Sequence, residues 1–304
     1  MNLFDHIIGH ERVCEVLRRQ VESKQLAHAY LFVGPEAVGK TTVAQAFIEA
    51  LAGPLAANPN VSVLERETDP ETDKLASSIS VVQVRALVER LTLSAFGSGY
   101  KAAFIKEADR LNTNAANALL KTLEEPRGDT LMVLRAPSLE SVPETIASRC
   151  QVFRFHPVAA TTIETMLRTR GIPTEDASEL TRLARGRPGV ALCLLKDAAF
   201  RAEHSLARDA AERFLKASLP ERFRLIADLL PKEEANKAVA ATQTLDALEE
   251  TLRDRLLSAL HHSTTPPLHH ARPFDAIHAS RQALRGNVSP ALALEHVALN
   301  LPSV

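Results

Sequence analysis

Short apolar runs alternate with longer amphipathic segments through the first half of the chain. A run of four to eight apolar or β-branched residues predicts a buried strand, and apolar residues at steps of three and four predict a helix. The predicted strands lie within 29–34, 62–67, 102–105, 130–137 and 150–157. The predicted helices lie within 40–53, 80–93 and 112–126. Strands separated by helices of this length are typical of a parallel, doubly wound α/β sheet.

Local signals mark the ends of these helices. Gly53 closes the first, Ser80 is a candidate N-cap for the second, and Pro126 stops the third. Glycine favours helix C-termini, serine favours N-caps, and proline cannot continue a helix.

The strand signals end at Pro157, and the second half of the chain predicts helices alone. Three short helices are predicted within 162–172, 177–186 and 188–197. One long helix farther on has an apolar face made of Leu245, Leu248, Leu252, Leu256 and Leu260. We therefore expect three domains: an α/β domain over 1–156, a small helical domain over 157–203 and a helical domain over 204–304.

The composition is that of a globular protein, with 304 residues, 45% hydrophobic and 24% charged. No apolar run approaches the roughly 20 residues that span a bilayer. The N-terminal segment 1–13 lacks the basic-then-apolar order of a secretion signal. We therefore expect a cytoplasmic protein with no membrane partner.

Net charge and cysteine content exclude two classes of function. Proteins that bind nucleic acid on their own usually have an excess of basic residues, and this chain, with a net charge of −1, has none. Cys14, Cys150 and Cys193 are far apart and form no CxxC pair, which argues against a disulfide framework or a zinc site. Four histidines near 261–270 match no standard metal spacing and predict a solvated loop.

The segment GPEAVGKTT, residues 34–42, fits the phosphate-binding pattern G-x-x-x-x-G-K-[ST] between a predicted strand and a predicted helix. Gly34 and Gly39 allow the backbone amides to wrap around phosphate oxygens. Lys40 would reach the β- and γ-phosphates, and the Thr41 hydroxyl, with Thr42 beside it, would stand at a Mg²⁺ ion. The candidate ligand is ATP or ADP.

A second strand of such enzymes ends in an Asp that holds Mg²⁺, and a Glu after it polarises the attacking water. Here the strand 102–105 runs into Lys106 and Glu107. An ammonium at the metal position would compete with Mg²⁺, so we expect no metal ligand there and only a vestigial base at Glu107. Asp109 more plausibly caps the following helix than replaces the missing acid.

Several blocks together carry a family resemblance. They are 4–13, 28–35, 79–134, 143–150 and 284–301, with NALLKTLEEP and SRC as the most specific parts. The chain resembles bacterial clamp-loader subunits of the AAA+ type, and is most similar to the delta-prime family of DNA polymerase III. The resemblance implies a RecA-like ATPase domain, a helical lid and a helical collar. It also implies gamma/tau-like and delta-like partners in a hetero-pentamer that places a sliding clamp on primer-template DNA.

The same resemblance assigns a role to Ser148, Arg149 and Cys150, which match the SRC motif. Arg149 would be an arginine finger that reaches the γ-phosphate bound by a neighbouring subunit. A guanidinium suits that role because it is always charged and makes forked contacts with phosphate oxygens.

The chain also departs from the family. The sensor position after the fourth predicted strand falls at Arg135, so sensing of the γ-phosphate within this subunit is in doubt. The segment from Gly186 to Gly189 lies where the family has a sensor residue in its lid. Arg187 is either that sensor or an ordinary turn residue. The four-cysteine zinc module of many relatives is missing from 53–65, so no zinc is expected.

Three interpretations follow. The first is a non-hydrolysing subunit that donates Arg149 and binds nucleotide weakly or not at all. The second is a gamma/tau-like motor subunit that hydrolyses ATP with the intact loop 34–42. The third, an unrelated kinase or transport ATPase, is disfavoured by Lys106 and by the SRC block.

Overall fold

The computed structural model describes residues 3–56, 58–68, 75–92, 100–126, 128–262, 271–286 and 288–302, without the side chains of 235, 257–262, 271 and 285. The chain forms two compact units, Met1–Lys196 and Asp197–Val304. The first unit contains both the α/β domain and the helices expected to form a lid. The predicted boundaries at 156 and 203 stay predictions.

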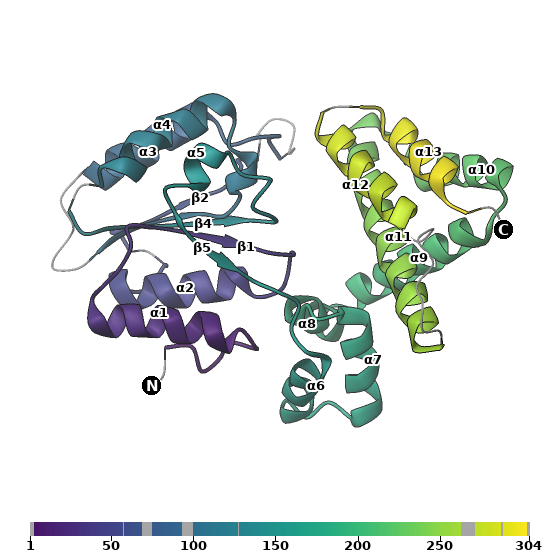
Figure 1. Cartoon of the computed structure of the whole chain (residues 1–304), viewed down its shortest axis with the longest axis horizontal. Helices are drawn as coiled ribbons and strands as arrows, with labels where there is room; N and C mark the ends of the chain where they lie inside the picture. Colours follow the sequence, from purple (N-terminus) through teal and green to yellow (C-terminus); the bar gives the residue numbers. More distant parts are fainter. Residues whose placement is uncertain are drawn as a thin grey trace. The chain divides into compact units, whose positions relative to one another are not determined.

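Five parallel strands form the sheet of the first unit, in the order β2-β3-β4-β1-β5 (Figure 1). The strands are β1 (Ala29–Val33), β2 (Val61–Leu64), β3 (Lys101–Ile105), β4 (Thr130–Ala136) and β5 (Gln151–Arg154). The predicted parallel sheet is therefore confirmed. Because β1 lies between β4 and β5, the segments that follow these three strands meet at one edge of the sheet.

Helices cover both faces of this sheet (Figure 1). They are α1 (Glu11–Ser23), α2 (Lys40–Ala52), α3 (Val81–Thr92), η1 (Ala108–Arg110), α4 (Thr113–Glu124) and α5 (Glu144–Ala147). Side chains of β1 alternate between the faces: Tyr30 and Phe32 pack with α1 and α2, whereas Leu31 and Val33 pack with α3 and α4. Both faces are buried, as a parallel sheet requires.

Three short helices complete the first unit: α6 (Ala160–Thr169), α7 (Thr174–Ala184) and α8 (Pro188–Lys196). The backbone ties them to the α/β part at two points. Val158 N–H donates to the carbonyl of Gly186 at 2.8 Å, and Gly189 N–H donates to the carbonyl of Ala37 at 2.9 Å. The second contact places the start of α8 directly against the phosphate loop.

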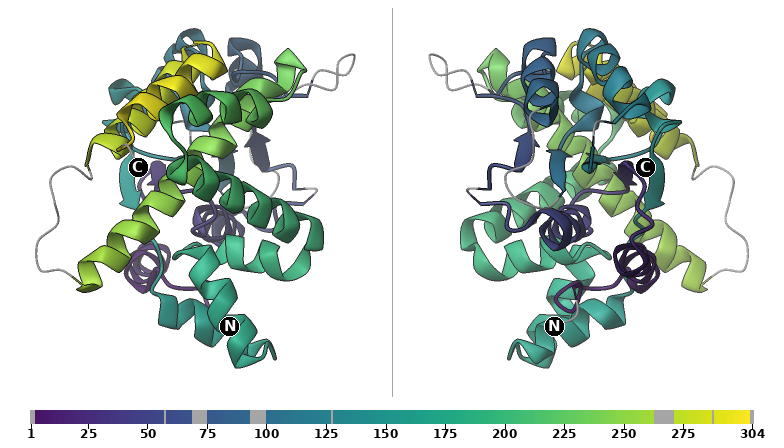
Figure 2. Two further views of the ribbon diagram at one scale, coloured as in Figure 1. Left: turned by 90° about the vertical axis from the view of Figure 1, so that its right-hand side faces the viewer. Right: turned by 90° about the vertical axis from the view of Figure 1, so that its left-hand side faces the viewer.

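The second unit is helical throughout its described part (Figure 2). Its helices are α9 (Ala198–Lys216), α10 (Leu219–Leu229), α11 (Glu234–His262), α12 (Ala271–Arg285) and α13 (Pro290–Asn300). Phe214, Leu245 and Leu294 are fully buried in its core, and they come from three different helices. None of the described helices of either unit is long and apolar enough to cross a membrane.

Some local predictions are confirmed and others are wrong. Ser80 caps α3, because its Oγ accepts from Gln83 N–H at 3.3 Å. Asp109 does not cap α4: it lies in η1, and the Asn112 side chain accepts the Ala115 N–H at 2.8 Å instead. The predicted solvated loop at 261–270 lies outside the described side chains, and 263–270 outside the described residues.

Candidate functional site

The loop between β1 and α2 has the backbone that its glycines predict. Gly34 has φ +150°, and a Cβ there would lie 2.3 Å from the carbonyl oxygen of Phe155, so only glycine fits. No side chain caps the N-terminus of α2 at Gly39, so the first-turn amides of this helix keep their capacity to bind an anion.

Lys40 lies under this loop with 2% of its side chain exposed. Its ammonium donates to the carbonyl of Gly34 and, at 2.7 Å, to the carbonyl of Pro35. Burial is the main reason that the pKa of Lys40 is lowered to about 8; the Glu36 and Asp109 carboxylates oppose this shift, and the Arg135 guanidinium adds to it. A buried cation at the centre of the loop favours an anionic ligand.

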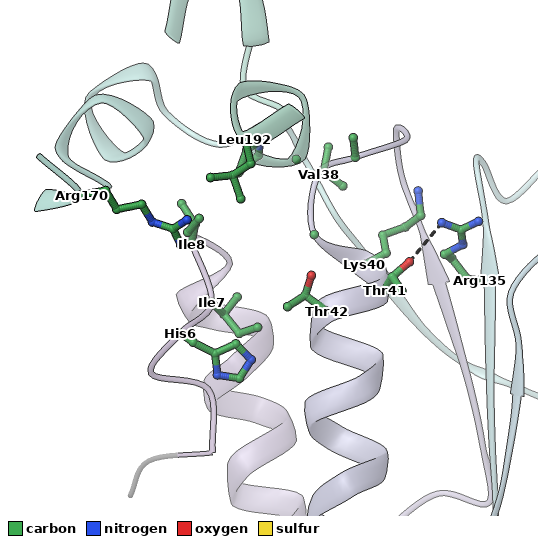
Figure 3. Close-up of a pocket in the computed structure, with 14 residues that line it drawn as sticks. His6, Ile7, Ile8, Val38, Lys40, Thr41, Thr42, Arg135, Arg170 and Leu192 are labelled. Carbon is green, nitrogen blue, oxygen red and sulfur yellow. Dashed lines mark hydrogen bonds between the residues drawn. The ribbon is translucent and has the colours of Figure 1, made fainter. Parts of the chain in front are cut away.

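A cavity of about 320 Å³ opens beside the loop. Figure 3 shows Lys40 and Arg135 at one side of it and Ile8, Leu192 and Arg170 at the other. The apolar lining comes from the N-terminal segment and from α8. Lys40 and Arg135 lie where the loop meets β4, and Arg170 lies at the opposite side. Apolar walls with a few placed polar groups are typical of small-molecule sites, and this size suits a nucleotide.

Arg135 is the feature of this cavity whose role the sequence interpretation missed. It pairs in register with Phe32 of β1, which places it beside the start of the loop. Nε donates to the carbonyl of Lys106 at 2.7 Å, and Nη1 donates to Thr41 Oγ1 at 3.1 Å (Figure 3). Nη1 also lies 3.2 Å from Glu36. The parallel pairing of the two predicted strands was the signal that could have located it.

Lys106 and Glu107, which the sequence places at the metal side of the site, contact residues outside the loop. Lys106 points to Glu65, with 2.9 Å between its Nζ and Oε2. Glu107 makes a two-pronged ion pair with Arg66 at 2.8 and 3.0 Å, and the hydrogen bonds from Arg66 lower the pKa of Glu107. Glu107 is therefore a structural partner of Arg66 and is not oriented as a base toward the loop.

The SRC residues lie outside this cavity. Ser148 follows α5, and the Arg149 guanidinium donates to Glu124 at the end of α4 at 2.5 and 2.8 Å and to the carbonyl of Thr145 at 2.8 Å. About a third of the Arg149 side chain is exposed. Burial raises the pKa of the Cys150 thiol to about 12, so it stays neutral and inert. The structure thus brings together Gly34, Gly39 and Lys40 to Thr42, and places Arg149 apart.

Comparison with known proteins gives the family. Residues 9–159 match the family model described as DNA polymerase III, delta subunit. The chain is 35% identical to the DNA polymerase III subunit delta' of Bacillus subtilis, over 51% of this chain and 50% of that protein. It is 36% identical to the subunit delta' of Pseudomonas aeruginosa, over 54% of each. The matched half of the chain belongs to the family of DNA polymerase III delta-prime subunits.

The matched region covers about half the length of these delta-prime relatives. The structural similarity to known proteins covers more of the chain than these sequence matches do. A DNA polymerase III gamma subunit-related protein of Thermotoga maritima has a TM-score of 0.52 at 17% identity, over 93% of this chain and 97% of that one. The RuvB branch-migration motor of the same organism has a TM-score of 0.53 at 17% identity, over 85% and 90%. These neighbours fit a RecA-like AAA+ domain with additional helical parts.

The delta-prime-like site does not fit the magnesium ion that its fold implies. Magnesium prefers six oxygen ligands at about 2.0–2.1 Å. Here the Thr41 hydroxyl already accepts from Arg135, and none of the described residues that line the cavity is Asp or Glu. A divalent and a monovalent cation about 4 Å apart repel by about 8 kcal/mol at an effective dielectric constant of about 20. A nucleotide phosphate, in contrast, fits the uncapped amides and the two cations.

The helix α8 meets the loop through a glycine. A Cβ at Gly189 would lie 2.9 Å from the carbonyl oxygen of Ala37, so a side chain there would displace the loop. Arg187, the other candidate at this turn, directs its Nε to the carbonyl of Ala184 at 3.4 Å. Arg170, at the C-terminal end of α6, lines the cavity instead, a placement that the sequence did not reveal.

Proposed function

We propose that this chain is a clamp-loader subunit of the replicative DNA polymerase III holoenzyme that donates Arg149 to a neighbouring motor subunit and does not hydrolyse ATP itself. It would assist ATP-driven loading of a sliding clamp onto primed DNA. The observation that carries the non-hydrolysing role is Arg135, whose Nη1 lies at Thr41 where a catalytic metal would stand.

The geometry of the acids supports the same conclusion. A working site needs a carboxylate to hold the metal and another to orient water. Lys106 takes the first position and pairs with Glu65, and Glu107 is held by Arg66. This subunit therefore has neither the metal-holding carboxylate nor a base oriented for water. An arginine finger needs neither group, because it acts on nucleotide that a neighbouring subunit holds.

Arg149 has the properties that such a finger needs. Its guanidinium lies at the partly exposed end of α4, and its contact with Glu124 is an exposed ion pair. Pairs of this kind contribute only about 0–1 kcal/mol, so the guanidinium can exchange Glu124 for a phosphate at low cost.

The proposed partners are gamma/tau-like motor and delta-like subunits in a hetero-pentamer in the cytoplasm. The relatives include the DNA polymerase III subunit tau of Bacillus subtilis, 31% identical over 53% of this chain and 30% of that one. Contact with the clamp and with primer-template DNA would be made through the complex, because a net charge of −1 disfavours independent DNA binding. No zinc is proposed.

An ATP-hydrolysing motor subunit is the second candidate. The intact loop 34–42 and its 320 Å³ cavity favour it, because a working motor needs both. The two candidates differ in whether the isolated chain turns over ATP.

The purified chain is expected to show no ATPase above that of its Lys40→Ala variant. The physical reason is that Lys106 takes the metal-holding position and that Arg66 holds Glu107, the expected base. Phosphate release with saturating ATP and Mg²⁺ measures this. Turnover in the wild-type chain that Lys40→Ala abolishes would establish the motor interpretation instead.

Nucleotide affinity is expected to fall as the pH rises above about 8. Lys40 has its pKa lowered to about 8 by burial, so its ammonium is lost above that pH, whereas a bound phosphate favours the charged form. The dissociation constant for ADP would rise by up to about tenfold per pH unit until the pKa of the complex is reached. Calorimetric titration from about pH 7 to 10 measures it. Lys40→Met should bind weakly with no such dependence, and a flat wild-type profile would contradict the prediction.

A further inference from the structure

We propose that the cavity binds a nucleoside diphosphate or triphosphate as the metal-free anion, with the Arg135 guanidinium in the place that Mg²⁺ takes in related sites. This inference deepens the proposed function and rests on its claim that the loop is a non-hydrolysing site. It is carried by contacts of Arg135, Thr41 and Lys40, none of which involves Arg149.

The position of Arg135 is fixed from two sides. Its Nε is held by the Lys106 carbonyl at 2.7 Å, and its Nη1 by Thr41 Oγ1 at 3.1 Å. The Glu36 carboxylate adds a contact at 3.2 Å from a largely exposed side chain. Among the described residues, none accepts a hydrogen bond from Nη2. The guanidinium therefore keeps donors for a phosphate oxygen while remaining anchored.

The charges around the loop favour a free anion over a metal complex. Lys40 and Arg135 lie at the phosphate end of the cavity, and Arg170 lines its other side (Figure 3). No described residue that lines the cavity is acidic, and Glu36, which contacts Arg135, is a largely exposed residue of the loop. In a magnesium-dependent site the metal neutralises phosphate charge, and carboxylates hold the metal. Here the protein supplies the positive charge itself, so a metal-bound nucleotide would bring a cation against a cation.

The other end of the cavity suits a nucleoside. Ile7, Ile8 and Leu192 are apolar, and they come from the N-terminal segment and from α8. The hydrogen bond from Gly189 to Ala37 holds α8 next to the loop, so Leu192 lines the same cavity as Lys40. Burial of a base between these walls would add affinity that does not depend on metal.

The test is the dissociation constant of ADP for the isolated full-length chain, measured by calorimetry with EDTA and with excess Mg²⁺. We expect the constant in EDTA to be equal to or lower than that in Mg²⁺. Arg135→Gln should weaken binding in EDTA by about ten- to a hundredfold, because a charge-assisted hydrogen bond is lost. Arg135→Lys, which keeps the charge and loses the fork, should give an intermediate value.

Arg154→Gln is the matched control, because Arg154 is an exposed strand arginine that does not line this cavity, and its binding should equal that of the wild type. Binding at least tenfold weaker in EDTA than in Mg²⁺, no binding in either condition, or full affinity of a folded Arg135→Gln variant would each overturn the proposal. If Arg135→Gln fails to fold, the wild-type comparison decides alone. Loss of nucleotide binding would leave the Arg149 role untouched, since that role is measured in the assembled complex.

Discussion

Replacement of Arg149 with alanine is expected to lower ATP hydrolysis at the neighbouring site that it serves by on the order of 10³-fold or more. An arginine finger stabilises the charge that develops on the transferred phosphoryl group, and alanine provides no substitute. Folding should be unaffected, because the side chain is partly exposed and its pairing with Glu124 is a surface contact. The measurement is the ATPase rate of the complex reconstituted with clamp and primed DNA.

Two variants separate a finger from a merely structural arginine. Arg149→Lys keeps the charge but loses the forked geometry, so it should recover only part of the rate. Glu124→Gln removes the intramolecular partner and leaves Arg149 charged, so the rate should stay within a few-fold of the wild type. Assembly of each complex is checked by gel filtration. A fully assembled Arg149→Ala complex that hydrolyses ATP at the normal rate would exclude the finger assignment.

The sheet and the loop could be predicted from the sequence because local patterns determine them. Buried strands of a parallel sheet are continuous apolar runs, and the glycines of 34–39 accept backbone angles that other residues avoid. The nine-residue motif therefore predicted the loop between β1 and α2 that carries Lys40 and Thr41. The α2 helix also ends at Gly53, as its composition indicates.

The role of Arg135 could not be derived in the same way, because it depends on which strands are neighbours. Its contact with Thr41 spans 94 residues and exists only because β4 lies next to β1. Lys106 follows β3, as the sequence predicts, but its side chain contacts Glu65 after β2 and not the loop. The sequence therefore predicted a defective metal side, and the fold adds that Arg135 donates a hydrogen bond to the Thr41 hydroxyl.

Arg222 is the clearest example of a residue whose structural role cannot be predicted from local sequence patterns. In the sequence it is one of several charged residues on an amphipathic helix, yet only 2% of it is exposed. Its guanidinium donates to four backbone carbonyls: Phe214 at 3.2 Å, Ala298 at 3.2 Å, Leu301 at 3.3 Å and Pro302 at 2.8 Å. These carbonyls lie at the C-terminal ends of α9 and α13, where orphan acceptors and the helix dipole favour a cation.

Arg222→Met is therefore expected to destabilise the second unit by at least about 3 kcal/mol, because several buried carbonyls lose their donor together. Hydrogen exchange in the full-length chain measures this, since amide protection in α9 and α13 should fall by about a hundredfold. Arg224→Met is the matched control: Arg224 lies two positions away on α10 and is exposed, so its protection should match the wild type. Equal protection in the two variants would mean that the four carbonyls are satisfied without Arg222. A selective loss at α13 would identify one buried arginine as the link that holds the C-terminal helix, and with it the proposed collar, in place.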